Sequence, residues 1–62
     1  MNGAKSSEIF VEYVVQGNVV KATAIDSATG IEASILGPVS GAREALADAA
    51  VRKLKYLLEK ET

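Results

Sequence analysis

Apolar and polar residues alternate along two neighbouring stretches near the start of the chain, at about 8–16 and 18–26. Both stretches are rich in β-branched residues, and the alternation is typical of strands that bury one face. Between them, Gly17-Asn18 fits a two-residue hairpin loop with glycine where a type II′ turn requires a positive φ. This turn predicts the register of the hairpin, in which Val15 pairs with Val20, Tyr13 with Ala22 and Val11 with Ala24.

The two faces of this predicted hairpin differ in polarity. One face is almost entirely apolar and is expected to face the core; it holds Ile9, Val11, Tyr13, Val15, Val20, Ala22 and Ala24. The opposite face mixes Glu8, Glu12, Gln16, Lys21 and Thr23 with the apolar residues Phe10, Val14, Val19 and Ile25.

A turn and a third strand are predicted to follow. The segment Asp26–Gly30 offers a side-chain acceptor at Asp26 and a glycine suited to a left-handed conformation at its end. The alternation from about 31 to 36 then predicts a strand with Ile31, Ala33 and Ile35 on the core face, unless a bulge shifts the register by one residue. Gly37-Pro38 is expected to end this strand.

The remaining residues have helical periodicity, from about 40 to 60, with Ser40 as the expected N-cap. The stripe predicted to pack on the sheet contains Leu46, Ala47, Ala50, Val51, Leu54, Leu57 and Leu58. Residues 8–62 are therefore predicted to form one α+β domain, a three-stranded antiparallel β-meander followed by one C-terminal α-helix (β-β-β-α). Residues 1–7 are expected to be a disordered tail.

The alanines of the helix raise a question, because alanine buries little surface. We expect that they do not fill the core and that several form a second, shallow face with Tyr56, namely Ala42, Ala45 and Ala49. One interpretation is that alanine occurs at these positions only because it is a strong helix former. The other is that small side chains admit another backbone, with Tyr56 as an anchor.

The second sheet face favours the latter interpretation, because one helix covers one face and leaves the other open. An open apolar face and a long first strand at the sheet edge indicate an interface, so we expect a homodimer. The candidate interface is Phe10, Val14, Val19, Ile25, Ala45, Ala49 and Tyr56. The segment 37–41 is a possible hinge through which two subunits exchange helices, giving an intertwined or domain-swapped dimer. Alternatively, its glycines simply close the third strand and admit the helix.

Composition removes several classes of function. The chain has no cysteine and no histidine, so we expect no disulfide, no metal site and no cofactor. The five serines have no evident base to activate them, and we expect no catalytic residues and no enzyme activity. The net charge is −1, so the chain has no overall positive electrostatic field that would attract nucleic acid or an anionic membrane. No apolar run is long enough to span a membrane. Without an export signal, the expected location is the cytoplasm.

Nucleic-acid binding is the alternative function. The segment SGAREALADAAVRKLKYLL resembles the last helix of double-stranded RNA-binding domains and its entry. That family places lysines at the helix start, whereas this chain has Gly41, Ala42 and Arg43 there, and the family's first helix is absent. The candidate contacts would be the basic residues near the helix end, Arg52, Lys53, Lys55 and Lys60.

Four segments together, EIFVEY, GNVVKATAID, ATGIEASILGP and VRKLKYLLE, resemble a small family of short alphaproteobacterial proteins with no established activity. The resemblance covers Glu8 to Lys60. It implies a bacterial cytoplasmic protein and gives no site residues. The sequence thus predicts a structural or interaction module that acts as a homodimer, as an adaptor or regulator of another protein.

Overall fold

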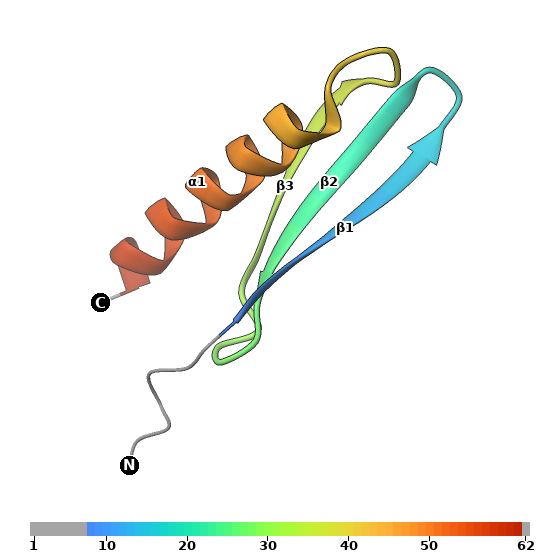
Figure 1. Cartoon of the computed structure of the whole chain (residues 1–62). Coiled ribbons are helices and arrows are strands. Elements are labelled where there is room, and N and C mark those ends of the chain that lie inside the picture. The colour runs from blue at the N-terminus through green and yellow to red at the C-terminus, as the bar shows by residue number, and fades with distance from the viewer. Residues whose placement is uncertain (1–7, 62) are drawn as a thin grey trace.

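The computed structural model describes residues 8–61, so the predicted tail at 1–7 lies outside the described residues. Three strands, β1 (Ile9–Gln16), β2 (Val19–Asp26) and β3 (Glu32–Pro38), are followed by the helix α1 (Arg43–Glu61). The strands form one antiparallel sheet in the order β1-β2-β3, with α1 along one face (Figure 1). The predicted α+β class and the β-β-β-α order are confirmed.

The first hairpin has the predicted turn and register. Gly17 has a φ of 60°, as a type II′ turn requires of its first central residue. Val15 pairs with Val20, Tyr13 with Ala22 and Val11 with Ala24.

The second turn is closed by Asp26, as its side-chain acceptor predicted. One carboxylate oxygen of Asp26 accepts hydrogen bonds from the N–H of Thr29 at 3.0 Å and from its hydroxyl at 2.8 Å. Gly30 has a φ of 79°, which is the predicted left-handed glycine. Ala24 pairs with Ala33 in a continuous ladder, so the third-strand register is the one predicted without a bulge.

Strand β3 and helix α1 begin and end at different residues from those predicted. β3 continues through Gly37 to Pro38. Proline is tolerated there because β3 is an edge strand and loses no ladder hydrogen bond. The Gly41 N–H donates to the carbonyl oxygen of Pro38 at 3.0 Å, which places Ser40 inside a turn. The helix therefore begins at Arg43, and Ser40 is not its N-cap.

Alanine fills much of the core, at positions that the sequence pattern placed on the core faces of the sheet and the helix. The buried apolar residues are Val20, Ala22, Ala24, Ala33, Ala50 and Leu54, and four of these six are alanines. Small side chains on both the sheet and the helix bring the helix backbone close to the strands. Larger, partly buried residues then surround this contact, among them Ile9, Val11, Ile35, Leu46 and Leu57.

Helix α1 packs on β2 and β3 and barely reaches β1, which is the strand farthest from it in Figure 1. A helix is about 10 Å wide and neighbouring strands lie about 4.8 Å apart, so one helix covers two strands. Tyr13 and Val15, predicted on the core face, are consequently exposed. Within the described residues, no helix is long and apolar enough to cross a membrane.

Candidate interaction surfaces

The sheet face that points away from α1 is the first candidate surface, and we call it the open sheet face. Four of its apolar side chains are exposed: Phe10 by 52%, Val14 by 48%, Val19 by 42% and Leu36 by 66%. Ile25 is half-buried on the same face. At the centre of this face, the hydroxyls of Thr23 and Ser34 are joined by a 2.8 Å hydrogen bond. Glu12 belongs to the same central row, because it pairs with Thr23. A face with large exposed apolar side chains on both sides of a polar row is suited to contact with protein.

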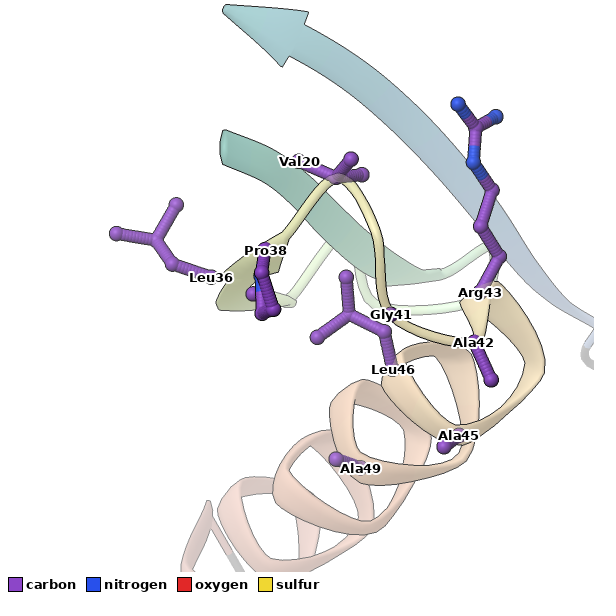
Figure 2. A pocket seen from close by; sticks show the side chains of 10 residues that line it. Val20, Leu36, Pro38, Gly41, Ala42, Arg43, Ala45, Leu46 and Ala49 are labelled. Atoms are coloured by element: carbon purple, nitrogen blue, oxygen red, sulfur yellow. The ribbon is translucent and has the colours of Figure 1, made fainter. Parts of the chain in front are cut away.

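A hollow of about 300 Å³ lies where the end of β3 meets the first half of α1 (Figure 2). Ala45 and Ala49 line it from the helix, Ala42 lines it from the residue just before the helix, and Leu36 and Pro38 line it from the strand. The predicted alanine face of the helix therefore forms one wall of a recess beside the sheet. Arg43 also lines this hollow and supplies a charged group.

Leu36 connects this hollow with the open sheet face. It also borders a smaller hollow of about 100 Å³ together with Val14 and Val19. Apolar side chains therefore extend from Val14 and Val19, at one end of the open sheet face, around the end of β3 to the alanines that line the larger hollow. The sequence pattern placed Leu36 on the second sheet face. Its position between the two hollows could be seen only in the tertiary structure.

The predicted interface residues fall into three places. Phe10, Val14, Val19 and Ile25 share the open sheet face, and Ala45 and Ala49 share the larger hollow. Tyr56 is exposed farther along the helix, where the ammonium of Lys60 lies 5.4 Å from the centre of its ring. The structure therefore groups four of the predicted residues on the open sheet face and two in the larger hollow, and it leaves Tyr56 apart from both.

The two edges of the sheet are protected unequally. At the β3 edge, the Lys53 ammonium donates a 3.0 Å hydrogen bond to the carbonyl oxygen of Ser34. Pro38 also lies on this edge and has no N–H to offer. Lysine and proline are the residues that natural proteins place on sheet edges to prevent further pairing.

The β1 edge is less protected against pairing than the β3 edge. The Ser27 N–H donates to the carbonyl oxygen of Glu8 at 2.9 Å, so the backbone groups of Glu8 point toward β2. Because these directions alternate along an antiparallel strand, the residues whose N–H and C=O groups point away from β2 are Ile9, Val11, Tyr13 and Val15. Arg43 covers the ring of Tyr13, with its guanidinium 5.4 Å from the ring centre. The Tyr13 hydroxyl also lies 3.5 Å from the carbonyl oxygen of Arg43.

The four basic residues considered for nucleic acid lie on two sides of the helix. Lys53 and Lys60 are seven residues apart on one side, and each has the partner described above. Arg52 and Lys55 lie on the other side, in a charged stripe with the acidic residues Glu44, Asp48 and Glu59. Within residues 8–61, no group of three histidine, cysteine, aspartate or glutamate side chains could hold a metal ion.

Comparison with known proteins identifies a family. The model of a family described as a domain of unknown function (DUF6898) matches residues 6–61. Neither the curated proteins nor the solved structures gave a match.

Proposed function

The chain thus belongs to the family described as a domain of unknown function, DUF6898, and we propose that it is a protein-interaction module that acts as a homodimer. In this role it adapts or regulates another protein in the cytoplasm and performs no catalysis. The support for this proposal comes from the exposed side chains of the described residues.

The observation that supports it most is the distribution of large apolar side chains. Leu54 and Val20 are the largest side chains that are fully buried, whereas Phe10 and Leu36 are more than half exposed. A domain this small seldom has more than about 3–5 kcal/mol of stability from its own core. Burying one Phe, Leu or Val side chain contributes about 1.5–3 kcal/mol, so covering a few of the exposed ones changes the stability substantially.

A second copy of the chain is the occupant that we propose for part of this surface. Small domains without disulfides or metals commonly gain stability from a partner subunit, and this chain has neither cysteine nor histidine. Two-fold homodimers are also the commonest oligomers of soluble proteins. The apolar surface that stays uncovered in the dimer is then available to the protein that it adapts or regulates.

Nucleic-acid binding has less support. Its four candidate cations are divided between two sides of the helix, and the side with Arg52 and Lys55 also carries acidic residues. Binding of duplex RNA that weakens with salt, and that is lost on Lys53→Glu/Lys55→Glu substitution, would favour this alternative.

The homodimer is tested by sedimentation velocity over a wide dilution series, with circular dichroism of the same samples. We expect a dimer that dissociates on dilution and loses helix and sheet signal as it does so. A folded monomer at every concentration would remove the homodimer from the proposal.

A matched pair of substitutions locates the contact surface. Val14→Thr replaces an exposed methyl group on the open sheet face, and Val39→Thr makes the same change in the turn after β3, at 42% exposure. Because each site occurs twice in a dimer, we expect Val14→Thr to weaken the dimer about tenfold. Val39→Thr is expected to leave the dissociation constant unchanged, and equal effects of the two changes would mean that the open sheet face is not at the contact.

A further inference from the structure

Strand β1 combines an open backbone edge with a symmetric pattern of apolar residues. Its outward edge presents the N–H and C=O groups of four alternate residues, Ile9, Val11, Tyr13 and Val15, without a neighbouring strand among the described residues. Its sequence from 9 to 15, IFVEYVV, is apolar at every position except the central one, Glu12. The apolar pattern is therefore symmetric about Glu12.

We propose that β1 pairs antiparallel with β1 of a second copy, about a two-fold axis that passes between Glu12 and Glu12 of the partner subunit. This inference rests on the proposed homodimer and specifies its geometry. An extended strand is the only element that satisfies a row of free backbone donors and acceptors, and an antiparallel pair of identical strands closes with two-fold symmetry.

This register pairs all four outward residues. Ile9 lies opposite Val15 of the partner subunit, and Val11 lies opposite Tyr13 of the partner subunit. Each such pair exchanges two N–H···O bonds, so the four pairs make about eight hydrogen bonds between the subunits. On the open sheet face, Phe10 lies opposite Val14 of the partner subunit, and the same contact occurs twice. Every apolar side chain of 9–15 thus meets another apolar side chain.

The cost of the register is one like-charge pair at the axis. Like charges directly opposite each other destabilise a sheet, whereas each apolar cross-strand pair stabilises it. The register sets two contacts between Phe10 and Val14 of the partner subunit against this single unfavourable pair. A shift by two residues in either direction would place Glu12 opposite Phe10 or Val14 and leave fewer backbone groups paired. Full pairing and apolar matching together select the Glu12-centred register.

The resulting assembly is a closed dimer. Both helices lie on the same face of a six-stranded sheet, because the two-fold axis is perpendicular to the sheet. The outer edges are the two copies of β3, which Lys53 and Pro38 protect. Pairing therefore stops at two subunits, and the open sheet faces of the two copies join into one surface.

Cross-linking of single-cysteine variants tests the register directly. The native chain contains no cysteine, so each variant has one cysteine per subunit. In the proposed dimer, the two Cα atoms at position 12 are about 4.5 Å apart, whereas those at 11 or at 13 are roughly 9 Å apart. A disulfide needs Cα atoms within about 7 Å, so we expect Glu12→Cys to cross-link much faster than Val11→Cys or Tyr13→Cys. Faster cross-linking at 11 or 13 would overturn the register.

The scan also separates this inference from the proposed homodimer. If sedimentation shows a dimer while none of the three cysteine variants cross-links, the dimer uses another surface and only the β1 pairing is wrong. If the native chain sediments as a folded monomer at all concentrations, the homodimer and the β1 pairing both fail.

Two further variants test the backbone and the charge. The Val15 N–H points away from β2, so Val15→Pro removes a donor from the free edge while the β1–β2 ladder keeps its bonds. We expect Val15→Pro to weaken the dimer more than tenfold, while the control Val15→Ala weakens it by less, with circular dichroism confirming that both fold. Glu12→Gln removes the like-charge pair and is expected to tighten the dimer about two- to fivefold. Weakening by Glu12→Gln, or equal effects at Val15, would contradict the pairing.

Discussion

Single residues in this chain contribute to stability according to whether they lie under the helix. Ala22, Ala24 and Ala33 from the sheet meet Ala50 and Leu54 from the helix. Because most of these side chains are single methyl groups, Leu54 provides the largest apolar volume at the centre of the core. The molecule therefore depends strongly on one side chain.

Replacing that side chain is expected to have a large effect. Leu54→Ala leaves a cavity and is expected to lower the free energy of unfolding by about 2–5 kcal/mol, which is comparable to the whole stability of a domain this small. Urea unfolding followed by circular dichroism measures it. Leu36→Ala removes the same atoms from a site that is 66% exposed and is expected to cost less than about 0.5 kcal/mol. Similar losses for the two variants would contradict the assigned core.

At the level of elements, α1 and β3 come into close contact at Gly37. A Cβ atom at this position would lie 2.9 Å from a methyl carbon of Leu46. In Figure 2, Leu46 extends from the helix beside Pro38. The glycine thus lets the first turn of the helix approach the end of the strand, and this contact sets how α1 sits on the sheet.

A double-mutant cycle tests this contact. Gly37→Val is expected to destabilise the protein by about 1–3 kcal/mol, because Leu46 must move. In a protein that already carries Leu46→Ala, the same change is expected to cost at least about 1 kcal/mol less, since the obstructing methyl groups are gone. Thermal or urea unfolding of the four proteins gives the coupling free energy. Additive effects would mean that Gly37 and Leu46 are not in contact.

At the level of the whole molecule, the turn after β3 decides which sheet the helix covers. The hydrogen bond from the Gly41 N–H to the Pro38 carbonyl oxygen closes this turn, and α1 packs on the sheet of its own chain. The predicted exchange of helices between subunits needs the same turn to open. It stays a prediction, independent of the pairing through β1.

Shortening the turn tests whether exchange is accessible. Deleting Val39 and Ser40 shortens the chain by about 7 Å, so the helix can no longer reverse onto its own sheet. With Val15→Pro added to weaken pairing through β1, we expect the shortened chain to fold only as a dimer with exchanged helices, as measured by sedimentation and circular dichroism over a dilution series. Ser40→Ala is the control, with a stability change below about 0.5 kcal/mol, since the turn hydrogen bond is between backbone atoms and Ser40 is not the helix cap. A folded monomer of the shortened chain would show that the turn does not control the packing of α1.

The amino-acid sequence by itself determined the features that depend on a few consecutive residues. Gly17 and Gly30 take the positive φ angles that their turns need, and Asp26 closes the second turn with its own side chain. The first turn set the register of β1 on β2, and alternation placed Phe10 and Val14 on the face opposite the helix, whereas the register of β3 stayed open to a bulge. The part of the candidate surface on the sheet could be predicted for this reason.

The tertiary structure alone decided which of these faces the helix covers and where the helix begins. A single helix spans two strands, so Tyr13 and Val15 stay exposed although their side chains are on the helix side of the sheet. The turn at Pro38 places Ser40 before the helix, so the helix begins at Arg43 and not at the predicted cap. These outcomes follow from the width of a helix and the packing of distant segments, which no local stretch of sequence specifies.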